Sequence, residues 1–244
     1  MSNLRQWLGS IVFTSYLFVS VPVYALVAFG AILVPGVAAF SAARAWARSV
    51  DRALELLCGL DCRVEGLEHL DGENCVVLLK HSSAWETITQ FIIFPPRQTW
   101  VMKRELLWVP ILGWVLTLFK PIAINRKGGR RAVEQVLKEG QQRLNDGFWV
   151  MIFPEGTRVP LGQKRRYGIS GALLASTSGR PVIPVAHDAG RYWPRRGLLK
   201  HAGTIRVAIG RPIPAAGRDA RELNAEVEAW IDAKLAEFEA TREG

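Results

Sequence analysis

His81 and Glu86 are the two residues whose types and spacing best suit acid–base chemistry in this sequence. They lie in the stretch LLKHSSAWET, which begins at Leu78. A carboxylate that accepts a hydrogen bond from one imidazole nitrogen fixes the tautomer and leaves the other nitrogen free to take a proton. The spacing therefore predicts a general base with an orienting acid. Taken alone, it also suits a capping pair without chemistry, which is the commoner use of such a spacing.

A second group of candidate residues follows an apolar run in the stretch FWVMIFPEGTR. Proline and glycine shape a turn there. Thr157 and Arg158 then offer donors that suit a phosphate, which arginine binds through two parallel hydrogen bonds. Glu155 could hold the arginines or order the turn. By itself this stretch predicts a turn with a surface arginine, and it becomes specific only together with the His81–Glu86 pair upstream.

The chain is strongly basic, since lysine and arginine exceed aspartate and glutamate by 9. This balance suits an anionic partner such as nucleic acid, a phosphorylated metabolite or an acidic membrane surface. Lys103 and Arg126 are further candidates for binding a phosphate. Lys103 also suits an ordinary strand end, and Arg126 belongs to a basic run that could face anionic lipid. No nucleic-acid-binding motif occurs, so we expect no nucleic acid among the partners.

The polar candidates follow apolar runs in a chain where strands alternate with helices. Helical patterns occupy residues 41–60, 82–94, 129–145 and 221–240. This alternation predicts an α/β fold with a mostly parallel central sheet flanked by helices. His81 then ends a strand that is apolar throughout, at the edge where such sheets bind ligands. The β-rich runs occupy 62–67, 74–80, 99–103, 121–125, 148–153, 180–186 and 204–210.

The N-terminal segment is the clearest compositional feature, because residues 6–43 contain no charged side chain. About 20 apolar residues are enough to cross a bilayer. Pro22 and Pro35 interrupt the segment and predict either two short apolar helices or one kinked span. We therefore divide the chain into hydrophobic, membrane-associated, membrane-docking helices at 1–59 and one α/β domain at 60–244.

Arginines flank this segment unequally. Arg44, Arg48 and Arg52 follow it, and only Arg5 precedes it. The positive-inside tendency predicts the cell (inner) membrane as the location, with the α/β domain on the cytoplasmic face. A monotopic hairpin that enters one leaflet and returns would leave the domain on the same side. The sequence leaves the spanning and monotopic arrangements open.

Cysteine and histidine occur in no arrangement typical of a metal site. Cys58, Cys62 and Cys75 match neither a disulfide framework nor a zinc spacing. The four histidines form no recognised metal pattern. We expect free thiols in a reducing compartment and no metal.

Two further segments have less specific interpretations. The apolar stretch at 106–119, which contains Trp108 and Trp114, suits core packing, and we hypothesise that it borders an acyl-chain tunnel or touches a membrane. The basic residues around YWP, among them Arg195, suit a solvated or lipid-facing patch.

Four blocks in a fixed order give the chain a resemblance to the glycerolipid acyltransferases, and within them to the bacterial 1-acyl-glycerol-3-phosphate (lysophosphatidic acid) acyltransferases. The pattern of that family is HxxxxD, then KxEL with a later basic residue, then FPEGTRS, then an apolar block with a central proline. The apolar N-terminal segment also looks like the membrane-docking helices of the family. The blocks that carry the resemblance are His81 to Glu86, KREL at 103–106 with INR at 124–126, FPEGTR at 153–158 and VIPVA at 182–186.

Two departures from the family pattern concern residues at the site. Glu86 stands where the family usually has aspartate, so the side chain is one methylene longer and the geometry of the pair must adjust. In the later loop, Val159 replaces the usual serine, and Gly168 follows Tyr167 where the family commonly has lysine. The basic residue that replaces this lysine is open among Lys164, Arg165 and Arg166.

The resemblance implies an O-acyltransferase of phospholipid biosynthesis. It would transfer an acyl group from acyl-CoA or acyl-carrier protein to the sn-2 hydroxyl of 1-acyl-glycerol-3-phosphate, giving phosphatidic acid. His81 would remove the hydroxyl proton, Glu86 would stabilise the imidazolium, and backbone N–H groups after His81 would stabilise the oxyanion. The expected partners are lysophosphatidic acid, the acyl donor and an anionic membrane surface, with no cofactor. The residues assigned to substrate binding are Lys103, Arg126, Glu155, Gly156, Thr157 and Arg158.

Three other functions remain open on the sequence. The acceptor could be another lysophospholipid or a lyso-aminolipid. A serine hydrolase could use Ser170 with Asp188 and His201, although such a serine needs a strand directly before it and GQKRRY is no buried strand. A basic binding protein without catalysis would keep its function in a His81→Ala variant, whereas an acyltransferase would lose it.

Overall fold

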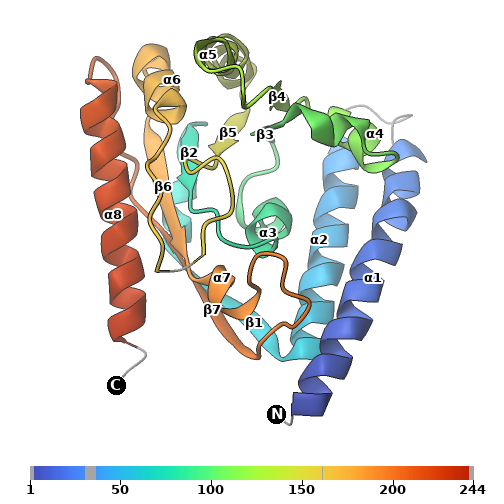
Figure 1. Cartoon of the computed structure of the whole chain (residues 1–244). Coiled ribbons are helices and arrows are strands. Elements are labelled where there is room, and N and C mark those ends of the chain that lie inside the picture. The colour runs from blue at the N-terminus through green and yellow to red at the C-terminus, as the bar shows by residue number, and fades with distance from the viewer. Residues whose placement is uncertain (1–2, 31–36, 161, 242–244) are drawn as a thin grey trace.

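Seven strands form one central sheet in the computed structural model, which describes residues 3–30, 37–160 and 162–241. The strands are β1 (Leu60–Glu65), β2 (Val76–Leu79), β3 (Gln98–Lys103), β4 (Ile122–Ile124), β5 (Trp149–Ile152), β6 (Val182–His187) and β7 (Gly203–Ile209). Their order across the sheet is β1-β7-β6-β2-β5-β3-β4 (Figure 1). Of the six neighbouring pairs only β6 and β7 run antiparallel.

The predicted α/β fold with a mostly parallel sheet is confirmed, and each β-rich run in the sequence overlaps one strand. The central strands explain why. β2 and β5 consist of VVLL and WVMI, and every one of these residues is buried. Because helices cover both faces of a parallel sheet, its inner strands must be apolar on both sides. The continuous apolar runs were therefore a reliable signal.

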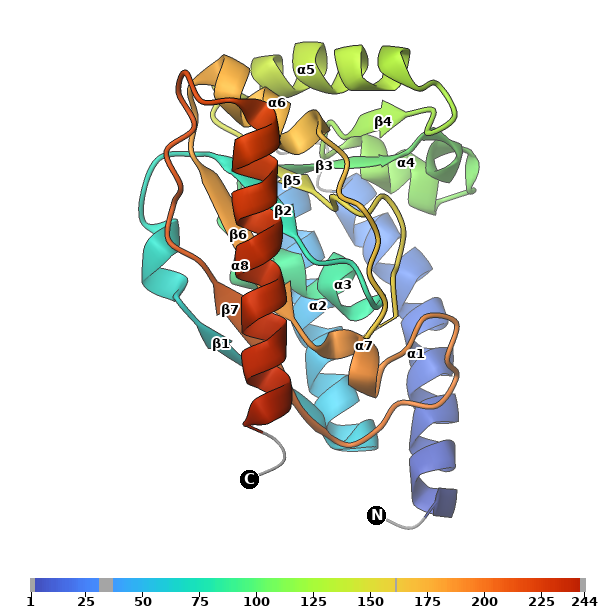
Figure 2. The same ribbon diagram turned by 60° about the vertical axis from the view of Figure 1, so that its left-hand side comes forward.

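Helices form a layer on each face of the sheet (Figures 1 and 2). The helices and 3-10 turns are α1 (Asn3–Gly30), α2 (Val37–Cys58), η2 (Leu67–Leu70), α3 (Trp85–Ile93), η3 (Arg104–Trp108), α4 (Leu112–Thr117), α5 (Arg130–Asn145), α6 (Ser170–Ser178), α7 (Ala189–Tyr192) and α8 (Ala220–Ala240). α5, α6 and α8 share one apolar cluster with one face of the sheet. α1, α2 and α3 share the other cluster with the opposite face.

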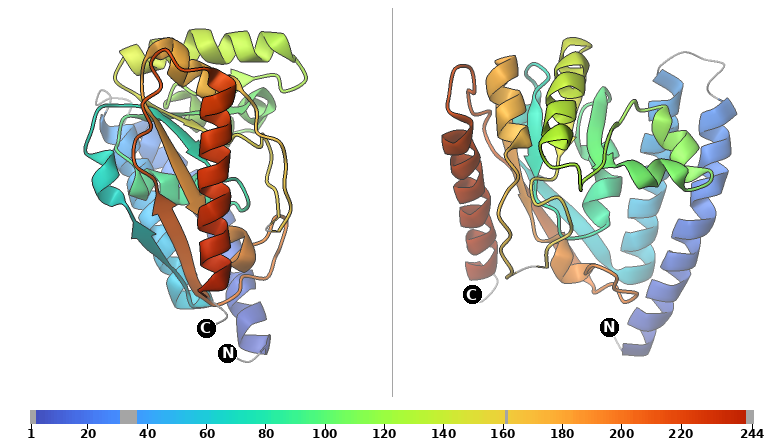
Figure 3. Two further views of the ribbon diagram at one scale, coloured as in Figure 1. Left: turned by 90° about the vertical axis from the view of Figure 1, so that its left-hand side faces the viewer. Right: turned by 45° about the horizontal axis from the view of Figure 1, so that its top comes forward.

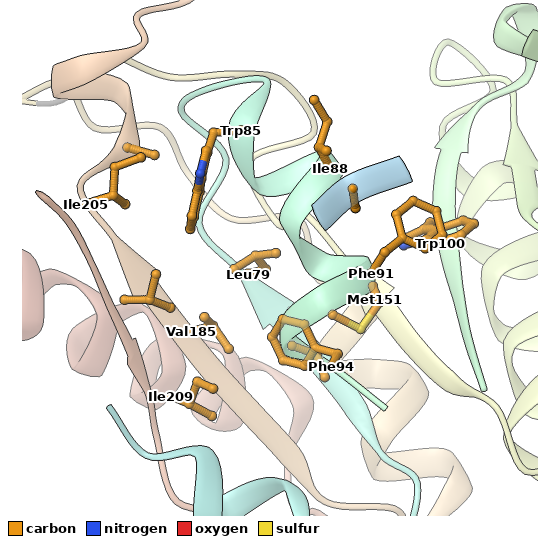
Figure 4. Packing of buried hydrophobic residues seen from close by; sticks show 14 of the residues in the cluster. Leu79, Trp85, Ile88, Phe91, Phe94, Trp100, Met151, Val185, Ile205 and Ile209 are labelled. Atoms are coloured by element: carbon orange, nitrogen blue, oxygen red, sulfur yellow. The ribbon is translucent and has the colours of Figure 1, made fainter. Parts of the chain in front are cut away.

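The second of these clusters is rich in aromatic side chains. Figure 4 shows Trp85, Ile88 and Phe91 of α3 lying over Leu79, Met151 and other side chains of the sheet. Phe91 and Trp100 meet edge to face, with 5.0 Å between their ring centroids. This packing fixes the position of α3 against β2. The turn between β2 and α3 is therefore held at both of its ends.

α1 is one helix of 28 residues that continues through Pro22. The sequence left open two short helices or one kinked span, and a break into two helices at Pro22 is excluded. The second proline, Pro35, lies outside the described residues. α1 lies along α2 for much of its length (Figures 1 and 3). It is also long and apolar enough to cross a bilayer. Since α1 and α2 contribute to the same core as the sheet, the boundary near residue 59 does not separate two cores.

The polarity of α1 is inverted relative to an ordinary surface helix. Its buried residues include Gln6, Ser10 and Ser20. Gln6 Nε2 donates to the backbone oxygen of Cys58 at 3.1 Å, and the Ser10 hydroxyl accepts the Lys200 N–H at 2.9 Å. The outward face of α1 is an apolar stripe of exposed side chains, namely Leu4, Trp7, Leu8, Ile11, Val12, Phe18, Val19, Val23, Leu26 and Val27.

Candidate active site

His81 lies at the carboxyl end of β2, two residues beyond the last strand residue, Leu79. α3 begins at Trp85, so a short turn brings Glu86 back to the histidine. His81 Nδ1 lies 2.9 Å from Glu86 Oε1, and the two side chains are 10% and 2% exposed. The structure thus joins the two residues that the sequence paired, and a small part of the histidine side chain still reaches solvent.

Glu86 also holds the turn itself, because Oε1 accepts the backbone N–H groups of Ser82 and Ser83 at 2.9 and 2.8 Å. Burial by itself raises the pKa of Glu86. The rings of His187 and His81 and the Ser83 N–H outweigh burial, so the pKa lies below its ordinary value and the group is a carboxylate at neutral pH. The expected oxyanion role is wrong for these two N–H groups, because Glu86 occupies both.

The contacts of His81 fix its tautomer. A carboxylate has no proton to donate, so Nδ1 carries the hydrogen of the 2.9 Å contact with Glu86. Nε2 is then unprotonated in the neutral ring and can take a proton from a hydroxyl group. Phe153 stacks on the imidazole, with 4.1 Å between the ring centroids and 24° between the planes, and so restricts its rotation. The arrangement fits the predicted general base.

Glu155 lies beneath His81 and not at the protein surface. Oε2 accepts the His81 N–H at 3.0 Å, and Oε1 forms an ion pair with Lys80 Nζ. The Glu155 side chain is only 1% exposed. Val159, which replaces the serine of the family pattern, is buried and donates its N–H to the His81 oxygen at 2.8 Å. The geometry favours a role for Glu155 in ordering the turn over direct contact with substrate.

The turn after β5 carries Arg158 toward this pair. Gly156 has a φ of +67°, a left-handed conformation that suits glycine, and Thr157 and Arg158 are half-buried beyond it. Desolvation lowers the pKa of Arg158, Glu86 opposes this effect and Arg195 adds to it, so the three charged groups lie near one another. Arg158 Nε is buried without a hydrogen-bond partner in the described part of the chain. The half-buried guanidinium of Arg158 nevertheless puts a positive charge near Glu86.

Arg195 is a residue of this region that the sequence assigned to a solvated or lipid-facing patch. Its Nη1 donates to the Arg158 oxygen at 3.1 Å. The same segment supplies the Trp193 oxygen, which accepts the Ser83 hydroxyl at 2.7 Å. No spacing in the sequence relates this segment to His81. Only the tertiary fold brings the two together.

Lys103 ends β3, and Arg126 follows the end of β4 by two residues on the same edge of the sheet. The strand order and a spacing of about 4.8 Å between strands put Lys103 roughly 10 Å and Arg126 roughly 14 Å from the axis of β2. Lys103 is 50% exposed, with Nζ 3.5 Å from Glu105. Arg126 is exposed overall, yet partial desolvation lowers its pKa; Glu105 opposes this effect and Arg165 adds to it. The basic candidates therefore form a row beside His81.

The contacts of Lys164 and Arg165 narrow the choice of the loop residue that could replace the missing family lysine. Lys164 pairs with Asp232 of α8, and that hydrogen bond raises the pKa of Lys164. Arg165 is exposed and close enough to Arg126 for the two charges to interact. Arg165 is therefore better placed than Lys164, and Arg166 is exposed without a contact to the site in the described residues. We call Lys103, Arg126, Arg158 and Arg165 the basic rim.

The serine-hydrolase alternative lacks the geometry that it requires. Ser170 is the first residue of α6, and no strand directly precedes it in the described chain between β5 and α6. Asp188 accepts hydrogen bonds from the backbone N–H and Nε of Arg206, at 2.8 and 2.9 Å. His201 is exposed. Asp188 is therefore engaged by Arg206, and Ser170 lacks the strand that such a nucleophile needs.

An apolar pocket lies between α1, α2, α3 and α4. It has an empty volume of about 530 Å³, part of it open to solvent. Leu112, Val115, Leu116 and Phe119 line it from the stretch that the sequence associated with an acyl-chain tunnel or a membrane. Trp108 in the same stretch is 71% exposed. The stretch therefore lines a pocket with one side and presents apolar surface with the other.

Comparisons with known proteins agree on one family. Residues 61–188 match the family model for acyltransferases. The chain is 44% identical over 196 residues to a 1-acyl-sn-glycerol-3-phosphate acyltransferase of Pseudomonas aeruginosa, covering 79% of this chain and 76% of that protein. An enzyme with the same description from Saccharomyces cerevisiae is 29% identical over 173 residues, covering 68% of this chain and 56% of the yeast protein.

A solved structure has the same fold. It is the crystal structure of the 1-acyl-sn-glycerophosphate (LPA) acyltransferase, PlsC, from Thermotoga maritima. The TM-score is 0.82, and the alignment covers 98% of each chain at 23% identity. At this identity the likeness establishes the architecture, including the apolar N-terminal helix beside the sheet.

Proposed function

This chain belongs to the acyltransferase family and is an O-acyltransferase, and from that premise we propose that it acylates the sn-2 hydroxyl of 1-acyl-glycerol-3-phosphate to give phosphatidic acid. The acyl donor is acyl-CoA or acyl-carrier protein. One observation carries the proposal: Glu86 holds His81 Nδ1 and also interacts with the half-buried charge of Arg158. A base beside an anion donor fits an acceptor that carries both a hydroxyl and a phosphate.

In this reaction His81 Nε2 takes the proton of the sn-2 hydroxyl while the hydroxyl oxygen attacks the thioester carbonyl. The carbon–oxygen bond forms, the carbon–sulfur bond breaks, and the leaving thiolate takes the proton from the imidazolium. Glu86 stabilises the imidazolium through Nδ1. Positioned proton transfer of this kind contributes about 10²–10⁴-fold to a rate. Because the substrate supplies the nucleophile, the reaction needs no metal and no cofactor beside the acyl donor.

The basic rim supplies the counter-charge for the phosphate. Arg158 lies next to the base, and Lys103 and Arg126 continue the row along the sheet edge. Gly156 and Thr157 shape the turn from which Arg158 projects. Glu155 serves the same site from beneath, through Lys80 and the His81 N–H.

The acceptor and the product are membrane lipids, and α1 supports a location at the membrane. Its apolar stripe faces outward, while its N-terminal half is bonded to Cys58 and Lys200 of the folded domain. A spanning orientation would draw those partners into the bilayer together with α2. We therefore favour a monotopic arrangement on the cytoplasmic face of the inner membrane, with the basic surface toward anionic lipid.

The apolar pocket between α1 and α4 suits part of an acyl chain. Its lining is almost entirely hydrocarbon and includes Ala28, Leu116 and Phe119. Phe91, which also lines the pocket, belongs to the same helix as Glu86. The helix that carries the apolar stripe, α1, supplies another part of the lining.

Complementation of a bacterial strain that lacks lysophosphatidate acyltransferase tests the function directly. We expect the parent chain to restore growth and the His81→Ala and Glu86→Ala variants to fail at equal expression. The purified chain is then offered lysophosphatidate, other lysophospholipids and a lyso-aminolipid, each with acyl-CoA and with acyl-carrier protein. Preference for a different acceptor, or growth supported by His81→Ala, would overturn the proposal.

A further inference from the structure

A second histidine, His187, lies directly behind the catalytic pair. It ends β6 and is completely buried. β6 runs parallel to β2 with Val185 opposite Leu79, so two residues later His187 is level with His81. Buried histidine side chains need partners for both ring nitrogens, and those partners here belong to the active-site turn and to α7.

Both nitrogens of His187 are engaged in a way that fixes a neutral tautomer. Nε2 lies 2.8 Å from the backbone oxygen of Lys80, which can only accept, so Nε2 carries a hydrogen. Nδ1 accepts the N–H of Ala189 at 3.3 Å and therefore carries none. The imidazole is held as a fixed donor aimed at the main chain before His81.

The peptide group between Lys80 and His81 is consequently held at both ends. Its oxygen accepts from His187 Nε2 at 2.8 Å, and its N–H donates to Glu155 Oε2 at 3.0 Å. The two side chains come from β6 and from the turn after β5, the strands on either side of β2. This peptide sets the direction in which the His81 side chain leaves the backbone. A rotation here would move the imidazole relative to Glu86.

His187 also lies near the unpaired oxygen of the catalytic acid. Glu86 Oε2 is buried and has no hydrogen-bond partner in the described residues. His187 Nε2 lies 3.8 Å from it, beyond hydrogen-bond distance but within range of an N–H dipole. The additional methylene of Glu86, compared with the aspartate of the family pattern, lengthens the reach of its carboxylate. His187 is the donor that partly compensates that buried charge.

We propose that His187 is a positioning residue of the acyl transfer, which orients the Lys80–His81 peptide and the Glu86 carboxylate without touching substrate. The proposal rests on His81 as the base of the proposed function. It predicts that the donor at the ε position matters and the ring itself does not. His187→Gln keeps an N–H near that position, whereas His187→Asn reaches only the δ position and His187→Leu has no donor.

The first experiment compares kcat and KM of these three variants in the full-length protein. We expect His187→Gln to keep kcat within about threefold, and His187→Asn and His187→Leu to lose roughly 10–100-fold in kcat with KM little changed, since a small misplacement of a catalytic group costs about that much. His69→Asn is the matched control, because His69 Nδ1 also contacts a backbone oxygen, that of Ile209, at 2.9 Å on another edge. Thermal melting of each variant checks that it is folded.

A double-variant cycle separates positioning from general damage. If His187 acts through His81, adding His187→Leu to His81→Ala should change the residual rate by less than twofold. A loss of the same factor in both backgrounds would overturn the proposal. So would full kcat in His187→Leu, or equal losses in His187→Gln and His187→Leu when both are folded.

Ring-nitrogen NMR tests the inference without any substrate. The parent protein should give a downfield proton from His81 Nδ1–H, bonded to Glu86, and His187→Leu should shift or broaden it while His187→Gln and His69→Asn should not. If the parent protein shows this NMR pattern but acylates no substrate, the proposed function is refuted. The conclusion that His187 orients His81 then still stands. An unchanged His81 signal in folded His187→Leu would refute the positioning role alone.

Discussion

The carboxyl ends of β2 and β3 carry functional side chains in very different surroundings. Around the end of β2, His81, Glu86 of α3 and Glu155 of the turn after β5 are buried, and each makes contacts to side chain and backbone. At the end of β3, Lys103 is 50% exposed and its nearest carboxylate, Glu105, lies at 3.5 Å. In the proposed reaction, this difference means that the base is organised before substrate binds, whereas the anionic ligand completes the basic rim.

Removal of the base should have the largest effect at the organised end. We expect His81→Ala to lower kcat by about 10²–10⁴-fold, because no other group takes the hydroxyl proton. KM for the acceptor should stay within a few-fold, since the basic rim is intact. Steady-state assays on vesicles measure both constants. The matched control is the exposed His201→Ala, and comparable losses in the two variants would contradict the assignment.

Substitution of Glu86 should have the next largest effect on kcat. Comparing Gln with Asp at this position also tests whether the length of the side chain matters. We expect Glu86→Gln to lose roughly 10–100-fold in kcat, because a neutral amide stabilises the imidazolium poorly. Glu86→Asp should lose about 10-fold, although aspartate is usual in the family. Its shorter side chain cannot keep both the His81 contact and the Ser82 and Ser83 contacts. Parent-like kcat in Glu86→Asp would show that the turn after β2 adapts to the shorter side chain. It would then be less rigidly organised than the comparison with the end of β3 implies.

The Lys80–Glu155 ion pair allows the organisation around β2 to be tested through protein stability, since neither side chain is assigned a direct contact with substrate. Lys80→Met leaves the Glu155 carboxylate buried with one partner fewer, and removing one member of a buried pair typically costs about 3–5 kcal/mol of unfolding free energy. Chemical denaturation of the detergent-solubilised protein measures the loss. Lys164→Met removes a solvent-exposed pair with Asp232 and should change stability little. Equal effects in the two variants would contradict this prediction.

Substitutions in the basic rim should have the smallest effects and should depend on salt. We expect Lys103→Gln and Arg126→Gln each to raise KM for the phosphate-bearing acceptor roughly fivefold to tenfold, with kcat nearly unchanged. Both effects should shrink as ionic strength rises, because exposed charges are screened over about 10 Å at 0.1 M salt. KM measured from 0.05 to 0.5 M salt tests this expectation. A loss in kcat that ignores salt would place these residues in the organised part of the site.

The sequence predicted the strands and the contact between His81 and Glu86 because both depend on local patterns. VVLL and WVMI are too continuously apolar to face solvent, and the turn after β2 brings Glu86 to His81 over five positions. The Lys80–Glu155 pair was not predictable in the same way. Its partners lie 75 positions apart, and nothing in either local stretch says that the two charges are buried against each other.

Two other features depended on packing that no local pattern encodes. Pro22 predicted a break or a kink, and the break is excluded because α1, which packs along α2, continues through the proline despite the loss of one backbone hydrogen bond. Arg195 lacked any motif relation to His81 and reaches the site only because the segment after α7 crosses the turn after β5. In both cases tertiary contacts decide the outcome.

The inverted polarity of α1 has a practical consequence for handling the enzyme. Lys200 is buried with its Nζ on the Thr14 hydroxyl at 2.6 Å, and Phe13 is enclosed against Trp193. Deleting α1 to obtain a water-soluble version would therefore expose Lys200 and the aromatic residues that α1 covers. Grafting on a foreign anchor would not restore either contact. The helix that carries the exposed apolar stripe thus also covers part of the buried core.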